Sequence, residues 1–177
     1  QAINTYLIFD DGEDLFFVDQ HAAHERILFD KFNDSLKKSE IVKQPLLLPY
    51  LLNVNNEEYV FLHSKIDLLR SMGIEIEEFG RNAFKVSAIP SFLIDMNLQK
   101  FFNDVLGDLD ELKSFSVGDL LIEKISQKAC KAAIKSGDKL SELEIKTLME
   151  KLKENIGLKC PHGRPVVVKI TRTEIDK

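Results

Sequence analysis

The sequence predicts an α/β fold arranged in two lobes, and three observations lead to this prediction. Short runs rich in aromatic and β-branched residues alternate with segments of helical periodicity. With 44% hydrophobic and 30% charged residues in 177, the chain can form a packed core and is not globally disordered. Strand-like segments stand near both ends, at residues 5–18 and 166–170, while the middle carries its own strand–helix pattern. We therefore expect the chain ends to share one lobe.

The first lobe begins with a predicted hairpin. Residues 5–9 and 15–18 are strand-like, and the acidic, glycine-containing residues 10–14 between them are typical of a turn. Apolar residues then recur at helical spacing from about His21 to Lys38, which predicts a helix directly after the second strand.

The middle of the chain predicts a βαββα-like lobe over residues 44–118. Two prolines bound residues 44–49 and forbid a helix through them. The elements expected after them are a helix at 56–71, strands at 74–79 and 83–87 joined by a turn, and a short helix near 98–112.

The last part returns to the first lobe, which we expect to consist of residues 1–43 and 119–177. A long helix is predicted at 119–136. A second helix begins at Ser141, where Ser141 and Glu144 form a capping-box pattern. A loop at 160–165 then leads into a strand at 166–170.

Charge and cysteine content narrow the possible functions. The net charge of −5 argues against stand-alone nucleic-acid binding, because neutralising phosphates supplies most non-specific affinity. Two cysteines cannot staple a chain of this length, so we expect thiols or metal ligands in a reducing compartment, the cytoplasm. No apolar run could span a bilayer. Because residue 1 is Gln rather than Met, we expect a piece of a longer protein.

The strongest cluster of chemical groups opens the first helix, in the segment from Asp19 to Glu25. Asp19 stands where a strand ends and a helix starts, a common position for functional groups in α/β folds. His21 and Glu25 are four residues apart and share a helix face. These donors suit a divalent metal. The alternative is that Asp19 only caps the helix and His21 and Glu25 form a surface pair.

Two further segments carry sulfur and nitrogen donors. Cys160 and His162 are two positions apart, so in an extended loop both could reach one ion; the alternative is a loop cysteine beside a solvated histidine. Cys130 lies among small residues at helical spacing, where a cysteine usually serves close packing. Soft donors favour zinc and oxygen donors favour magnesium or manganese, so a two-metal site is conceivable.

Three ordered motifs resemble the C-terminal domain of MutL, the mismatch-repair protein, in the group that carries a nicking endonuclease. That family's motif DQHA-x2-E-x4-E matches from Asp19 to Glu25, and Asp30 stands where the family has Glu. Residues 129–131, Ala-Cys-Lys, correspond to the family's ACR. Residues 160–165, Cys-Pro-His-Gly-Arg-Pro, match the third motif. The motifs span nearly the whole chain.

The resemblance implies a DNA strand-nicking activity that depends on manganese or magnesium, with zinc as a structural or regulatory ion. It places Asp19, His21 and Glu25 in catalysis. It implies a larger set of metal ligands: Asp19, His21, Glu25, Cys130, Cys160 and His162. Arg164 could contact the phosphate, but we favour an ion pair that fixes the loop. The resemblance further implies a homodimer formed through the first lobe, a regulatory role for the middle lobe, an absent ATP-binding portion, and contact with the mismatch-recognition protein MutS through the full-length protein.

The segment from Gln44 to Pro49 fits a second resemblance. Gln44, Leu47 and Pro49 match Q-x-x-L-x-P, the motif by which bacterial MutL endonucleases resemble other ligands of the replicative sliding clamp. The alternative is a proline-bounded linker packed on the core. Tethering to a clamp on double-stranded DNA would compensate for the acidic charge.

We compare three functions for this chain. The leading one is a dimeric, metal-dependent nicking domain. The second is a non-catalytic dimerisation and clamp-tethering module with a structural zinc site. A zinc hydrolase of small substrates is disfavoured, because the sequence has no H-E-x-x-H spacing.

Overall fold

The computed structural model describes residues 6–114, 119–134, 140–154 and 157–175. Helices and two antiparallel sheets are mixed along the chain, which confirms the predicted α/β class. The chain divides into two compact units, residues 1–30 with 134–177 and residues 31–133. Within the described ranges, no helix has both the length and the apolar character needed to cross a membrane.

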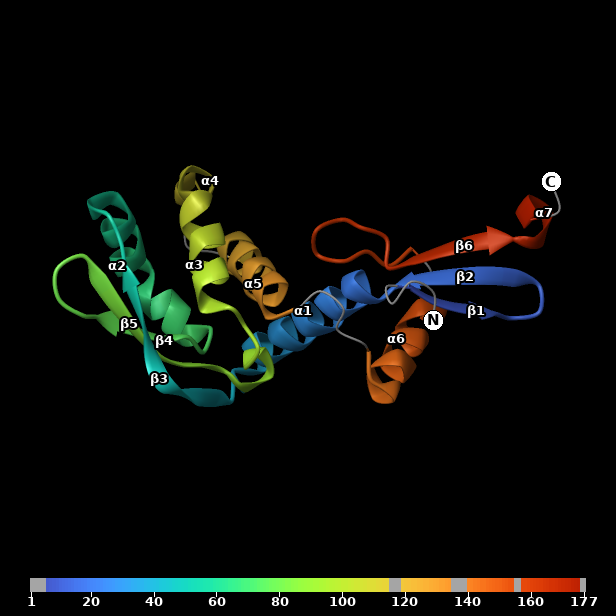
Figure 1. Ribbon diagram of the computed structural model, residues 1–177, viewed down its shortest axis with the longest axis horizontal. Helices are drawn as coiled ribbons and strands as arrows, with labels where there is room; N and C mark the ends of the chain where they lie inside the picture. Colours follow the sequence, from blue (N-terminus) through green and yellow to red (C-terminus); the bar gives the residue numbers. More distant parts are fainter. Residues whose placement is uncertain (1–5, 115–118, 135–139, 155–156, 176–177) are drawn as a thin grey trace. The chain divides into compact units, whose positions relative to one another are not determined.

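The first unit contains a three-stranded sheet in the order β1-β2-β6, seen in Figure 1. The strands are β1 (Tyr6–Asp10), β2 (Asp14–Asp19) and β6 (Val167–Thr171). β1 and β2 form the predicted hairpin, and the Asp11 side chain closes its turn by accepting hydrogen bonds from two backbone N–H groups. β6 pairs antiparallel with β2, so both ends of the chain contribute to one sheet. A short helix, α7 (Arg172–Ile175), follows β6 and was not predicted.

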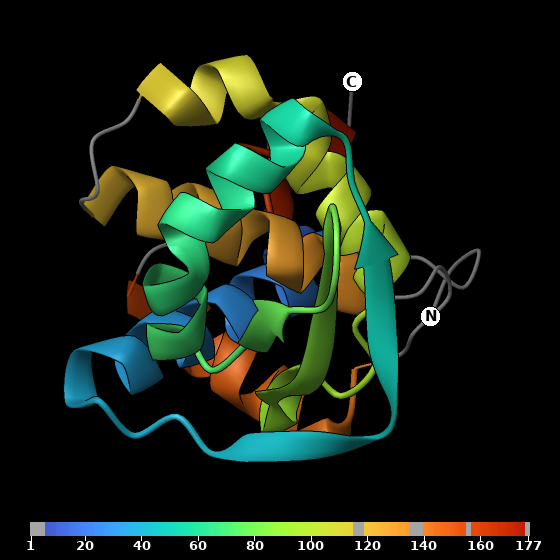
Figure 2. The same ribbon diagram turned by 90° about the vertical axis from the view of Figure 1, so that its left-hand side faces the viewer.

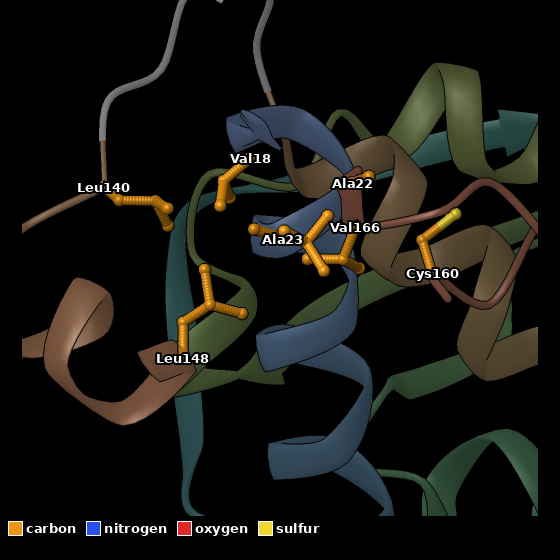
Figure 3. Packing of buried hydrophobic residues seen from close by; sticks show 8 residues of the cluster. Val18, Ala22, Ala23, Leu140, Leu148, Cys160 and Val166 are labelled. Atoms are coloured by element: carbon orange, nitrogen blue, oxygen red, sulfur yellow. The ribbon is translucent and has the colours of Figure 1, made fainter. Parts of the chain in front are cut away.

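Two helices contribute to the core of this unit: α1 (Gln20–Lys38), of which residues 20–30 belong here, and α6 (Glu142–Glu154). The predicted capping box is present, since Ser141 N–H donates to Glu144 over 2.8 Å and Glu144 N–H donates back over 3.4 Å. The buried side chains come from the sheet, both helices and the segments before α6 and β6, as Figure 3 shows. They are Val18, Ala22, Ala23, Leu140, Leu148, Cys160, Val166 and Val167.

The second unit is built on a sheet in the order β3-β5-β4. Its strands are β3 (Lys43–Asn53), β4 (Glu75–Glu78) and β5 (Ala83–Pro90). β3 is therefore an edge strand, a position that tolerates proline. Its pairing with β5 is interrupted between Pro45 and Tyr50, and β3 changes direction along its length, as Figure 2 shows. Residues 44–49, which open the predicted βαββα-like pattern, are thus part of a longer, irregular strand.

The helices of the second unit agree only partly with prediction. They are α2 (Asn56–Ser71), a 3-10 turn η1 (Ser91–Leu93), α3 (Leu98–Gly107), α4 (Leu109–Ser114) and α5 (Asp119–Ala133). α2 has the predicted bounds and is capped by Asn55 and Glu58. The single helix expected near 98–112 is wrong: Asp108 leaves helical geometry after Gly107 and its carbonyl begins α4. The expected end of α5 at residue 136 lies outside the described residues.

Aromatic stacking joins the helices of the second unit to its sheet. Tyr50 of β3 stacks on Phe102 of α3 at 6.1 Å between ring centroids, and Tyr59 of α2 stacks on Phe84 of β5 at 5.2 Å. The lobe boundaries expected at 43/44 and 118/119, and the dimerising and regulatory roles of the lobes, stay predictions.

Candidate metal centre

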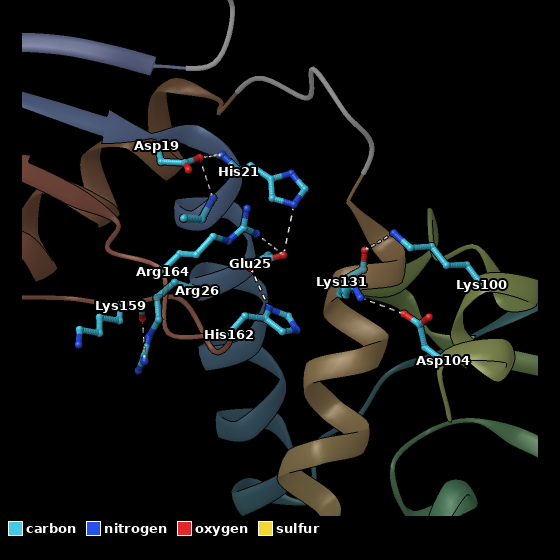
Figure 4. A network of polar contacts seen from close by, with 11 residues as sticks. Asp19, His21, Glu25, Arg26, Lys100, Asp104, Lys131, Lys159, His162 and Arg164 are labelled. Atoms are coloured by element: carbon cyan, nitrogen blue, oxygen red, sulfur yellow. Dashed lines mark hydrogen bonds and ion pairs between the residues drawn. The ribbon is translucent and has the colours of Figure 1, made fainter. Parts of the chain in front are cut away.

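The junction between β2 and α1 is held by Asp19 (Figure 4). One oxygen of its carboxylate accepts hydrogen bonds from the backbone N–H groups of His21 at 2.9 Å and Ala22 at 3.1 Å. Its own N–H donates to the Val166 carbonyl at 2.9 Å, which ties the helix start to the segment entering β6. Asp19 therefore does cap the helix, and this occupies one carboxylate oxygen. Its role as a ligand stays a prediction.

Glu25 lies at the centre of the polar cluster, one turn after His21 along α1. Its side chain is only 1% exposed. His162 Nδ1 donates to one carboxylate oxygen at 3.0 Å, and Arg164 Nη2 donates to the other at 3.1 Å. His21 Nε2 lies 3.2 Å from that second oxygen, as expected for residues sharing a helix face. A buried carboxylate is tolerated only when paired in this way.

The loop before β6 presents its side chains to Glu25 because its backbone turns tightly. Gly163 N–H donates to the Cys160 carbonyl at 2.9 Å, and Cys160 N–H donates to the Arg164 carbonyl at 2.8 Å. Gly163 has φ of +84°, a left-handed conformation that favours glycine. Cys160 is consequently buried, while His162 remains about one-third exposed at the mouth of the cluster. The expected loop-fixing ion pair of Arg164 is present, and its partner is Glu25.

Glu25, Cys160 and His162 each offer one donor atom, and these three atoms lie within 4.8 Å of one another. Zinc binds such donors at about 2.0–2.3 Å, so neighbouring ligand atoms in a zinc site lie about 3–4 Å apart. Small side-chain adjustments would therefore bring all three onto one ion. The set contains one oxygen, one sulfur and one nitrogen, which suits zinc better than magnesium. Among the described residues, this is the group that fits a metal.

The electrostatics of the cluster keep Glu25 ionised. Burial by itself raises the pKa of the Glu25 carboxyl. Hydrogen bonds from His162 and Cys160, together with the positive charges of His162 and Arg164, outweigh burial and lower that pKa from 4.5 to about 2. The carboxylate is thus available as a negatively charged ligand at neutral pH.

Cys130, the remaining predicted ligand, lies in α5 of the second unit and is fully buried there. The neighbouring small side chains Ser126, Ala129 and Ala133 are buried with it, which agrees with the packing alternative. Its participation in a metal site stays a prediction.

Two residues of α1, Gln20 and His24, were not assigned a role from the sequence. Gln20 is 2% exposed, and among the described residues its Nε2 has no hydrogen-bond partner. His24 Nε2 lies 3.1 Å from a carboxylate oxygen of Glu144, which joins α1 to the first turn of α6. No sequence signal could have predicted the contact between His24 and Glu144, because the two residues are far apart in the chain.

The predicted clamp-binding residues lie on β3. Leu47 is fully exposed and Leu48 is 82% exposed, whereas Gln44 donates a hydrogen bond to the Pro45 carbonyl at 3.3 Å. Pro49 lies in the stretch where pairing with β5 is interrupted. The linker alternative, in which these leucines pack on the core, does not fit Leu47 and Leu48.

A row of apolar side chains also crosses the first sheet. Ile8 pairs with Phe17, and Phe17 pairs with Val168 on the next strand. Ile8 is 42% exposed and Val168 is 50% exposed, so this row is accessible to a partner.

Comparison with known proteins gives consistent matches. The family model described as "MutL C terminal dimerisation domain" matches residues 1–140. Proteins named "DNA mismatch repair protein MutL" are similar over all of this chain: 34% identical in Clostridium botulinum (Loch Maree), 37% in Clostridium beijerinckii and 33% in Clostridium perfringens strain 13. The chain spans about a quarter of the length of these relatives, 26–27%.

Proposed function

Because the chain belongs to the MutL C-terminal dimerisation domain family, we propose that it is the homodimeric, metal-dependent DNA-nicking domain of a mismatch-repair protein. The observation that carries this proposal is the convergence of Glu25 with Cys160 and His162. A domain that served only to dimerise would have no need for a buried carboxylate beside a thiol and an imidazole. Two of the three motifs that resemble the nicking group of the family supply this cluster: the first contributes Glu25, and the third contributes Cys160 and His162.

Each residue of the proposed site would have its own role. Cys160 and His162 would hold zinc, Glu25 would help to hold a metal ion beside them, and the catalytic ion would be manganese or magnesium. Asp19 at the end of β2 and His21 in the first turn of α1 would complete the catalytic site. When bound, such cations supply a lowered pKa for an attacking water and positive charge for the leaving oxygen. Arg164 balances the charge of Glu25.

Because the chain is negatively charged, we expect another protein to recruit it to DNA. With a net charge of −5, the domain should bind DNA weakly by itself. The exposed leucines of β3 support contact with the replicative sliding clamp, whose known ligands insert apolar side chains into a groove. A clamp already on DNA would raise the local concentration of the domain.

The nicking proposal is tested with supercoiled plasmid in manganese. Wild-type protein should convert the plasmid to the open circle, and Glu25→Gln and Cys160→Ser should abolish this conversion. His63→Ala is the matched control, because His63 pairs with Glu78 in the second unit and is exposed. Equal residual nicking in all four proteins would indicate a contaminant. It would favour the alternative function, a tethering module with a structural zinc site.

Metal analysis separates the zinc site from catalysis. Purified wild-type protein should contain about one zinc per chain, and both Cys160→Ser and His162→Ala should lose it. Zinc content unchanged in both variants would contradict the ligand assignment.

Clamp contact is tested by binding to an immobilised bacterial sliding clamp. Leu47→Ala should weaken binding, because Leu47 stands at the leucine position of the motif and is fully exposed. Leu51→Ala is the control, since Leu51 lies on the same strand and is 52% exposed but falls outside the motif. Equal binding by both variants would argue against this use of β3.

A further inference from the structure

One pair of charged residues on α1 lies beside the metal centre without belonging to it. Arg26 follows Glu25 directly, and its Nη2 forms an ion pair with Asp30 at 2.7 Å. The two residues are four apart, so they share a face of the helix. Asp30 is the position at which this chain departs from the family motif. In the described part of the chain, Asp30 is not among the residues grouped around a possible ion.

The same guanidinium reaches the loop that carries the ligands. Arg26 Nη1 donates a hydrogen bond to the Lys159 carbonyl at 3.4 Å, and Lys159 immediately precedes Cys160. The planar guanidinium fixes the direction of both contacts together, which a lysine ammonium cannot do. Asp30 thus orients Arg26, and Arg26 holds the backbone at the start of the loop.

Two hydrogen bonds therefore join the loop to the helix, and each side donates one of them. Arg26 of the helix donates to the loop backbone at Lys159, and Arg164 of the loop donates to Glu25 of the helix. A backbone bridge between Lys159 and Pro165 closes the loop between these two points. A shift at Lys159 would be transmitted through this closed loop to Cys160 and His162.

The geometry points to Asp30 as a positioning residue that acts through Arg26 on the ligand loop, and not as a metal ligand. This inference rests on the proposed metal site at Glu25, Cys160 and His162. Residues that orient metal ligands without touching the ion commonly change metal affinity by about 10- to 100-fold when substituted. We expect an effect of that size from either member of the pair.

The test measures zinc affinity, by competition with a chelating dye, for Asp30→Asn, Arg26→Lys and the double variant. Each single variant should bind zinc about 10-fold more weakly or worse. The double variant should bind no more weakly than the weaker single variant, because both substitutions break one chain of contacts. Asp34→Asn, an exposed acidic residue one turn further along α1, is the matched control and should bind as wild type.

Cobalt supplies a readout that a loss of stability would not give. With Co²⁺ in place of zinc, the absorption arising from the Cys160 thiolate should shift or weaken in Asp30→Asn and Arg26→Lys, because the sulfur is misplaced. Circular dichroism of the metal-free proteins checks the fold. Should Asp30→Asn fail to fold, Asp30→Glu keeps the charge and should bind zinc close to wild type.

Three results would overturn the inference. If Arg26→Lys binds as wild type while Asp30→Asn does not, Asp30 is itself a ligand. If both variants bind as wild type, the pair has no positioning role. If the losses add in the double variant, the two residues act independently. Failure of the proposed function looks different: wild-type protein would bind no zinc, or Cys160→Ser would bind it as tightly as wild type.

Discussion

Replacing Glu25 by Gln should destabilise the metal-free protein by an amount that depends on pH. Glutamine has the shape of the protonated carboxyl and cannot ionise. The folded structure lowers the pKa of Glu25 from 4.5 to about 2, against the effect of burial, through His162, Cys160 and Arg164. At about 1.4 kcal/mol per pKa unit, ionisation of Glu25 stabilises the fold by about 3 kcal/mol at neutral pH.

The sign follows from the direction of the shift. Because the folded pKa lies below the unfolded one, this stabilisation is complete above about pH 4.5 and is lost as the pH falls toward 2. The free-energy difference between wild type and Glu25→Gln should therefore shrink from about 3 kcal/mol at pH 7 to about 1 kcal/mol at pH 3. At pH 7 this corresponds to a melting temperature lower by roughly 6–12 °C for a chain of this size.

Urea unfolding in the presence of a chelator, at neutral pH and near pH 3, measures both free energies. The chelator matters, because metal bound to wild type alone would add its own stabilisation. A difference that stays the same at the two pH values would refute the reasoning, since it would come from packing and not from charge. The absence of any difference at neutral pH would refute it as well.

Three other substitutions test the capping residue, the apolar sheet row and a crowded glycine. Asp19→Asn keeps the helix cap and should lower the free energy of unfolding by no more than about 0.5 kcal/mol, whereas Asp19→Ala should lower it by about 1 kcal/mol. Plasmid nicking should be lost in both variants. Nicking retained in Asp19→Asn would remove Asp19 from the catalytic set. Val168→Glu should shift the dimer toward monomer in light scattering. Val60→Glu, on α2 and even more exposed than Val168, should leave the protein dimeric, and a dimeric Val168→Glu would place the interface elsewhere. Gly73→Ala should destabilise the second unit by about 2–4 kcal/mol in thermal unfolding, because φ is +84° and the added Cβ would lie 2.5 Å from Ile41 Cγ2; an unchanged melting temperature would contradict this.

The fold was predictable where the information lies within one segment. The bounds of α2 and the capping box of α6 follow from helical spacing and from side chains three residues apart. The βαββα-like pattern implied a strand before the helix at 56–71, but the bounds of β3 were not predicted, because Pro45 and Pro49 normally oppose a strand. The edge position and the interrupted pairing that accommodate Pro45 exist only once the sheet has formed.

In the candidate site, too, the features within one segment were predictable and the contacts between segments were not. Asp19, His21 and Glu25 could be selected from one short segment at the junction of β2 and α1, and Cys160 and His162 from one loop. The capping bonds of Asp19 belong to the same local information. The pairing of Arg26 with Asp30 could also have been read from their spacing, but its contact with Lys159 could not.

The sequence by itself determined the donor types and the local geometry that presents them, because a helix and a tight turn place neighbouring side chains through short-range backbone bonds. Only the tertiary structure decided which donors meet. The pairing of β2 with β6 brings two segments more than a hundred residues apart into one sheet, and burial in the shared core then leaves Glu25 dependent on His162 and Arg164 for its charge. That dependence arises from desolvation, which exists only after the chain has folded.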